Sequence, residues 1–395
     1  MDKCYIDSGY IVCNAIGDAI NKKENSTASC ISKSDAENRV RFLRAHSLVS
    51  MLDFVVKKDD LRLYISDDDC QKLDAIVKKA VFKQLKFDAM SQSISDCLSK
   101  NAVKHIVLKG VEYKRFYPES FVRTSTDIDI YVDKSDLQKA KNALAEIGFL
   151  YHKAYDNREF SFKKEPRYYV ELHTDLEGFG KAQKRELRAL SDNANKVGGY
   201  RYALSDNDFY IYALFHLYKH FVLSGVGVRM FLDVYLIKKT ADLDYDYIAP
   251  VLKKLGISGF EQAVTQVNSC LFEKNIANDD IKAVVQFVLG SGTFGTVCDN
   301  RYLRKLNSKA TDTSKIKRLK NDYGLGFYSM KRRYPVLEKA PFLYPFSFVH
   351  RFFYGIVHRR DVLRNDKELK QSISKQTVDK YERILNTMQI ATDDK

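Results

Sequence analysis

Acidic and apolar residues alternate from Asp127 to Val132, as in a β-strand, and this pattern constrains the possible fold more than any other feature of the sequence. Successive side chains of a β-strand point to opposite faces, so Asp127 and Asp129 would lie side by side on one face. The isoleucine and valine side chains of the same run would form the other face and pack on a core. An apolar segment that ends in Gly110 lies upstream. The pattern predicts a sheet in which one strand carries two neighbouring carboxylates.

Two carboxylates placed this way need a cation. Two unit charges repel by about 4 kcal/mol at roughly 4 Å and an effective dielectric near 20, and a divalent metal such as Mg²⁺ relieves that repulsion. The alternative is a solvated acidic strand edge. The chain repeats Asp-x-Asp at Asp206 and Asp208, but that pair follows Ser205 and opens an apolar helical run, where acids serve as helix caps. We therefore place the metal at Asp127 and Asp129.

A two-metal site for phosphoryl transfer needs a third carboxylate, and Glu171 is the candidate. The segment from Arg167 to Asp175 alternates with period two, so Glu171 would share a face with His173. The sequence before it predicts a helix from Ser135 to Gly148 and then a hairpin over residues 149–163. This strand can thus return beside the aspartates. The alternatives are an ordinary exposed glutamate and a histidine that only forms a hydrogen bond.

The order of these parts resembles the DNA polymerase β superfamily of nucleotidyltransferases, and more closely an uncharacterised bacterial nucleotidyltransferase family. That family's pattern is Leu-Lys-Gly, a downstream Arg, Asp-Ile-Asp-hydrophobic-Val, and then hydrophobic-Glu/Asp-Leu-His. The matching residues here are Leu108-Lys109-Gly110, Arg123, Asp127 to Val132, and Val170-Glu171-Leu172-His173. The likeness runs from about residue 100 through further landmarks, which are His216, Arg229, Asp233, the turn Ser291 to Gly295 and the segment Tyr334 to Pro345.

The resemblance implies an α+β fold, a mixed sheet with flanking helices and with N-terminal and C-terminal helical regions. It implies a Mg²⁺-dependent enzyme that moves a nucleoside monophosphate from an NTP, taken to be ATP, to an unknown acceptor and releases pyrophosphate. Asp127, Asp129 and Glu171 would be catalytic and hold two Mg²⁺ ions, and Glu171 would also serve as general base. We expect these acids to meet at one point. Burial of any of them against a fixed cationic side chain would remove the support for an enzyme and leave only a helix-flanked α+β scaffold.

The nucleotide-binding residues would be Lys109, Gly110 and Arg123. Better characterised relatives carry Gly-Ser at this turn and hold the triphosphate with that serine, whereas this chain has Gly110-Val111. Cationic side chains and the backbone amides beside glycine would take over that task. The alternatives are a surface lysine and a loop arginine paired with a local acid. The missing serine also leaves open a catalytically inactive nucleotide- or RNA-binding module on the same scaffold.

Four further residues are second-tier candidates: His173, His216, Arg229 and Asp233. His216 and His220 lie four apart on one predicted helix, but no glutamate lies between them as in His-Glu-x-x-His, and no third ligand is evident. Arg229 and Asp233 are spaced in the same way. Their plainer interpretation is a helix salt bridge worth a few tenths of a kcal/mol.

Periodicity predicts three regions: an N-terminal helical region over 1–100, a catalytic domain over 101–203 and a C-terminal helical domain over 204–395. The net charge is +14, and residues 301–360 contain 15 Lys and Arg residues against three acids. This basic segment is also rich in aromatic residues, as single-stranded nucleic-acid binding requires. An anionic membrane, a lipid-linked acceptor or simple packing of long side chains are the alternatives.

The seven cysteines are scattered without a Cys-x-x-Cys pair, which argues against a disulfide framework and a zinc site and suits a reducing cytoplasm. The N-terminus has no apolar signal core, and no run of about 18 apolar residues occurs. We therefore expect a cytoplasmic protein without a transmembrane segment. No residue pattern specifies the acceptor, the preferred nucleotide or the oligomeric state.

Overall fold

The computed structural model describes residues 3–23, 32–55, 63–154, 158–176, 178–293, 295, 330, 334, 336–358 and 375–390. The chain forms two compact units. The first comprises Met1–Arg301 and Thr387–Ile390, and the second comprises Tyr302–Asn386 and Ala391–Lys395. The division into regions 1–100, 101–203 and 204–395 stays a prediction.

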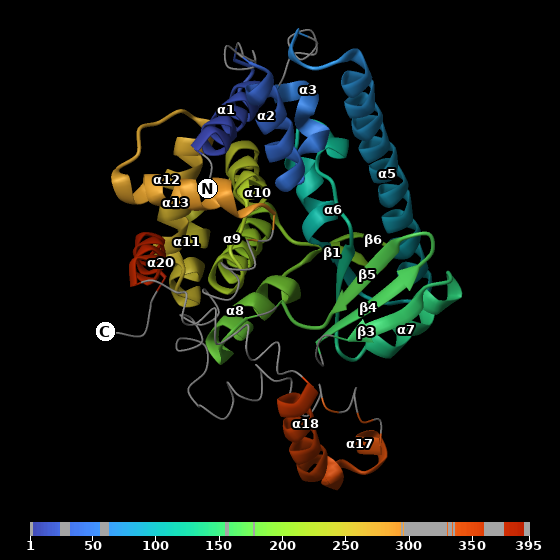
Figure 1. The fold of residues 1–395 in the computed structure, drawn as a ribbon. Helices are drawn as coiled ribbons and strands as arrows, with labels where there is room; N and C mark the ends of the chain where they lie inside the picture. The colour runs from blue at the N-terminus through green and yellow to red at the C-terminus, as the bar shows by residue number, and fades with distance from the viewer. Residues whose placement is uncertain are drawn as a thin grey trace. The chain divides into compact units, whose positions relative to one another are not determined.

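The first unit contains a seven-stranded mixed sheet with the strand order β3-β4-β5-β2-β1-β7-β6 (Figure 1). The strands are β1 (His105–Leu108), β2 (Ile128–Val132), β3 (Leu150–Ala154), β4 (Glu159–Lys164), β5 (Tyr168–His173), β6 (Asn195–Gly198) and β7 (Arg201–Ala203). β2 pairs with β1 antiparallel and with β5 parallel. The predicted hairpin is present as the antiparallel pair β3 and β4. A mixed sheet among helices confirms the expected α+β class.

Helices precede, interrupt and follow the sheet along the chain. Before it come α1 (Lys3–Ile20), α2 (Lys33–Ala45), the 3₁₀ turn η1 (Val49–Met51), α3 (Leu52–Val55) and α5 (Asp67–Lys100). Between the strands lie α6 (Lys109–Tyr113), η2 (Lys114–Phe116), η3 (Ser120–Val122), α7 (Leu137–Glu146) and α8 (Lys181–Asp192). After them come α9 (Asp206–Leu223), α10 (Val228–Thr240), α11 (Tyr245–Leu255), α12 (Ser258–Phe272), α13 (Asp279–Ser291), α17 (Val336–Lys339), η4 (Pro341–Leu343), α18 (Tyr344–His358) and α20 (Lys375–Thr387).

The apolar face of β2 and β5 packs against α5 and α7. The buried cluster includes Phe87, Ile94, Leu98, Ile128, Ile130, Val132, Ala140, Ala143, Leu144, Val170 and Leu172. Burial of each large aliphatic side chain contributes about 1.5–3 kcal/mol, so this cluster fixes which face of each strand points inward. Since strand faces alternate, Asp129 and Glu171 must point to the opposite face.

That opposite face is covered as well. Every residue of β2 is buried, and Asp129 and Tyr131 are 3% and 4% exposed. α9 supplies part of the cover, because Tyr212 and His216 lie near enough to Lys109 and Asp129 for the charges to shift their pKa values. The carboxylates therefore stand in an interior site rather than on an open strand edge.

The capping role expected for the second Asp-x-Asp pair is confirmed at the start of α9. Ser205 is the N-cap residue, and its hydroxyl oxygen accepts a hydrogen bond from the Asp208 backbone N–H at 3.1 Å. Asp206 and Asp208 lie in the first helical turn, where negative charge complements the helix dipole. The pair thus has a structural role, and no group of three potential metal ligands among the described residues includes it.

Most of the basic segment 301–360 lies outside the described residues, so nucleic-acid binding through it stays a prediction. Of this segment the structure describes 330, 334 and 336–358, which include a small cluster of Met330 and Leu337. Among the described residues, no helix is both long and apolar enough to cross a membrane.

Candidate active site

Strand register brings the candidate acids together. In the parallel pair of β2 and β5, Asp129 lies opposite Glu171, and Tyr131 lies opposite His173. One potential ligand atom from each of Asp129, Glu171 and His173 lies within 4.8 Å of the others. Asp127 directly precedes β2 and lies close enough for Asp129 to raise the pKa of its carboxyl, in addition to the effect of burial. The fold thus brings Asp129 and Glu171 together with His173, and Asp127 does not belong to this close group.

Asp129 is the most tightly held of the three acids. Its Oδ1 atom accepts hydrogen bonds from Lys109 Nζ and from His173 Nε2, both at 2.8 Å. Burial opposes ionisation, but Lys109 and His173 outweigh it and hold the pKa of the Asp129 carboxyl well below its ordinary value. Oδ2 of Asp129 accepts no hydrogen bond from any residue that the structure describes. One oxygen is therefore occupied and the other is available to a ligand.

Glu171 and Asp127 have far fewer partners. The Nε2 atom of His173 lies 4.0 Å from Oε2 of Glu171. Burial and then the neighbouring Asp129 raise the pKa of Glu171 to about 7. Asp127 accepts a hydrogen bond from Thr126 Oγ1 at 3.2 Å. A divalent cation that binds oxygen would neutralise negative charge that these three carboxylates share.

Lys109 contradicts our expectation that no cationic side chain is fixed against these acids. Its ion pair with Asp129 is buried, with 15% and 4% of the two side chains exposed. Burial lowers the pKa of Lys109, but Asp129 reverses this and raises it above the ordinary value, so the lysine stays charged. Its backbone φ is +48°, in the left-handed region that non-glycine residues rarely adopt. The turn between β1 and α6 thus holds the ammonium at Asp129 on a strained backbone.

Gly110 has a packing role that the sequence did not indicate. A Cβ atom at this position would clash with the hydroxyl of Ser125. Ser125 in turn is fixed by its backbone N–H, which donates to Oε1 of Gln84 at 2.7 Å. Glycine is therefore required here by the close approach of the segment that leads into β2. Its predicted contact with phosphate stays a prediction.

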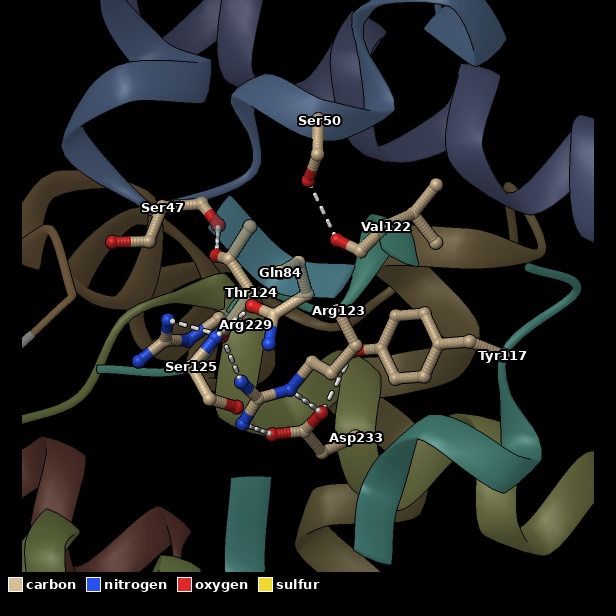
Figure 2. Close-up of polar contacts among 10 residues, drawn as sticks. All are labelled: Ser47, Ser50, Gln84, Tyr117, Val122, Arg123, Thr124, Ser125, Arg229 and Asp233. Carbon is tan, nitrogen blue, oxygen red and sulfur yellow. Dashed lines mark hydrogen bonds and ion pairs between the residues drawn. The ribbon is translucent and has the colours of Figure 1, made fainter. Parts of the chain in front are cut away.

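Arg123 is fully engaged inside the protein. Its Nε and Nη2 atoms donate to the two oxygens of Asp233 at 2.6 and 2.8 Å, and Nη1 donates to the Thr124 carbonyl at 2.6 Å (Figure 2). The Tyr117 hydroxyl also donates to Asp233 at 2.7 Å. Asp233 therefore pairs with an arginine 110 positions away rather than with Arg229, one turn earlier on α10.

His216 and His220 contact each other on α9, with ring centroids 4.5 Å apart. Burial lowers the pKa of both residues, so both imidazoles are neutral near pH 7. Among the described residues, neither belongs to a group of three potential metal ligands. The pair is best understood as part of the cover over the Asp129 site.

The N-terminal helices contribute supporting residues that sequence reasoning missed. Ser50 Oγ donates to the Val122 carbonyl at 2.6 Å, and Gln84 of α5 holds Ser125 as described above. These contacts position the segment that carries Arg123 and leads to Asp127. Single Ser and Gln residues more than 40 positions away give no pattern that could have pointed to them.

A sequence family described as uncharacterised nucleotidyltransferases matches residues 32–273, which is more than half of the chain. The match begins at residue 32 rather than near residue 100, so α2, α3 and α5 lie within the matched region and α1 precedes it. It ends before the turn Ser291 to Gly295 and the segment Tyr334 to Pro345. No curated protein and no solved structure matches. The chain belongs to this family of uncharacterised nucleotidyltransferases.

Proposed function

We propose that the protein is a Mg²⁺-dependent nucleotidyltransferase that moves a nucleoside monophosphate from an NTP to an acceptor and releases pyrophosphate. The observation that carries the proposal is the register of β2 and β5, which sets Asp129 directly opposite Glu171 with Asp127 beside them. Family membership supports the reaction class. ATP as the nucleotide, a cytoplasmic location and the nature of the acceptor stay predictions.

Asp127, Asp129 and Glu171 would hold the metal. These donors fit the metal, because Mg²⁺ prefers carboxylate oxygens. The carboxylates of Asp127 and Glu171, which have few partners, and Oδ2 of Asp129 would supply those oxygens. Bound there, the metal would neutralise the triphosphate and make the acceptor oxygen a better nucleophile. His173 would keep Asp129 oriented through its hydrogen bond to Oδ1.

Glu171 would serve as the general base. In the metal-free protein, burial and the neighbouring Asp129 raise the pKa of Glu171 to about 7. Its place opposite Asp129 in the strand register would let it take the proton of an acceptor hydroxyl. Lys109 would supply positive charge at the phosphates. Its ion pair uses one oxygen of Asp129 only, so the lysine orients the carboxylate without occupying the oxygen that a metal would take.

The Lys109 pair also favours the second candidate, a catalytically inactive nucleotide-binding module. A lysine permanently bound to Asp129 would replace the metal in such a protein. The partner-poor carboxylates of Glu171 and Asp127 oppose this alternative, because clustered negative charge weakens the binding of a phosphate.

Calorimetric titration of ATP, with Mg²⁺ and with EDTA, tests the proposal without knowledge of the acceptor. We expect Mg²⁺-dependent binding that Asp129→Asn abolishes and that Asp192→Asn, a change of the same charge at a 58% exposed side chain, leaves intact. Pyrophosphate release from each NTP with protein, tRNA or sugar phosphates as candidate acceptors then tests transfer. ATP binding that is the same with Mg²⁺ and with EDTA, and that Asp129→Asn leaves unchanged, would instead identify the inactive module.

A further inference from the structure

A buried cluster beside the candidate active site contains two guanidinium groups and one carboxylate. Arg123 and Arg229 both donate to the carbonyl of Thr124, at 2.6 and 3.5 Å, so the two cations converge on one point (Figure 2). Asp233 is the carboxylate, and its two oxygens are taken by Arg123, with Tyr117 as a further donor. The two guanidinium groups outnumber the one carboxylate of the cluster, and a further acid that acts on the pKa of Arg229 is Asp127 of the candidate active site.

Arg229 is the guanidinium without a partner of opposite charge. Its only hydrogen bond among the described residues is the long one to Thr124, and its Nε atom is buried without any acceptor. A guanidinium has five N–H donors in a rigid planar fork that matches carboxylate and phosphate oxygens. The residue as a whole is partly exposed.

Other unsatisfied donors gather at the same place. The hydroxyl of Ser125 and the amide nitrogen of Gln84 are buried without hydrogen-bond partners. Together with Arg229 Nε they account for three of the seven such atoms found among the described residues. Buried polar groups are normally paired, so three donors in one cluster indicate a ligand with acceptor oxygens.

The electrostatic environment of Arg229 points the same way. Burial and then the charge of Arg123 lower the pKa of Arg229 to about 10, which leaves it charged at neutral pH. Arg229 is also the second residue of α10, a helix of 13 residues, whose N-terminus adds partial positive charge. The site is thus arranged to receive an anion.

Its position identifies the anion as a phosphate chain. Ser125 contacts Gly110, next to Lys109, whose ammonium pairs with Asp129. Thr124, which Arg229 contacts, lies three residues before Asp127. The cationic cluster and the carboxylates therefore border the same turn. A ligand that spans both must carry negative charge at one end and bind a metal at the other, as a nucleoside triphosphate does.

We propose that Arg229 anchors the pyrophosphate portion of the NTP, with Ser125 and the N-terminus of α10 as further donors. This inference rests on the proposed nucleotidyltransferase function. Arg123 does not bind the phosphates in this proposal, because it is bound to Asp233. It acts as a positioning residue that holds Thr124 and repels the guanidinium of Arg229.

Binding of inorganic pyrophosphate in the presence of Mg²⁺, measured by calorimetry, tests Arg229 without any turnover. Arg229→Met should raise the dissociation constant by about 10- to 100-fold, as expected for loss of charge-assisted hydrogen bonds. Arg229→Lys should recover part of the affinity, because it restores the charge but not the fork. Arg185→Met removes the same charge at a 78% exposed side chain and should leave the constant unchanged.

The melting temperature of the ligand-free variants separates a binding role from a structural one. Since Arg229 has no partner of opposite charge among the described residues, Arg229→Met should melt at or above the wild-type temperature. An unchanged pyrophosphate affinity in Arg229→Met, no pyrophosphate binding by the wild type, or a melting temperature that falls would each overturn the inference. If pyrophosphate binding depended on Arg229 but the protein transferred no nucleotide, the result would contradict the proposed function and not the role of Arg229.

Discussion

Replacement of Arg123 by Met should destabilise the protein strongly. The change leaves Asp233 buried, with 2% of its side chain exposed, and removes both ion-pair contacts. Removing one partner of a buried ion pair costs about 3–5 kcal/mol. We expect the lower end, roughly 3 kcal/mol, because the Tyr117 hydroxyl still donates to Asp233. In a unit of this size, that loss corresponds to a fall in melting temperature of about 5 °C.

Urea denaturation followed by circular dichroism measures this loss of stability. A second substitution, Asp233→Asn, should restore at least about 1 kcal/mol to Arg123→Met, because no uncompensated carboxylate then remains. Arg188→Met is the matched control, since Arg188 forms a comparable contact with Asp133 at 3.0 Å but is 55% exposed, and surface pairs contribute about 0–1 kcal/mol. If Arg123→Met cost no more than Arg188→Met, the view of Arg123 as a structural residue would be wrong.

Three further predictions concern the carboxylate site. The pKa of Glu171, at about 7, lies above its ordinary value, so the ligand-free fold loses stability as pH rises from about 4.5 to 7. In urea titrations with EDTA, the free energy of unfolding of Glu171→Gln should therefore increase relative to wild type across this pH range. If the difference in unfolding free energy between the two proteins did not change with pH, the raised pKa would be wrong. His173→Ala should weaken Mg²⁺ binding by about 10-fold in calorimetry because Asp129 loses its orienting donor, whereas an unaltered affinity would leave His173 no such role. Gly110→Ala should cost about 1–3 kcal/mol through its clash with Ser125, and Ser125→Gly should rescue it; no rescue would mean that the strain lies elsewhere.

The part of the site that sequence reasoning predicted is the part that obeys strand periodicity. Ile128 and Ile130 had to face a core, which forced Asp129 to the other side, and the same alternation did this for Glu171. The spacing of the intervening helix and hairpin brought the two strands together. Local patterns of this kind encode which face a residue occupies and which strands can be neighbours.

The rest depends on contacts between residues far apart in the chain. Arg229 and Asp233 have ideal spacing for a helix salt bridge, yet Arg123 takes Asp233 because it reaches both carboxylate oxygens from a buried position. Lys109 binds Asp129 for a similar reason, since it directly follows Leu108, which lies opposite Asp129 in the pairing of β1 and β2. No periodicity in the sequence indicates which of several cations a buried acid will bind.

A crystal structure with Mn²⁺ and a non-hydrolysable ATP analogue tests most directly whether the acids of β2 and β5 share a metal. We predict anomalous density that contacts both Oδ2 of Asp129 and the carboxylate of Glu171, with the phosphate chain against Arg229. An unchanged ion pair between Lys109 and Asp129, without anomalous density between the two strands, would contradict the account.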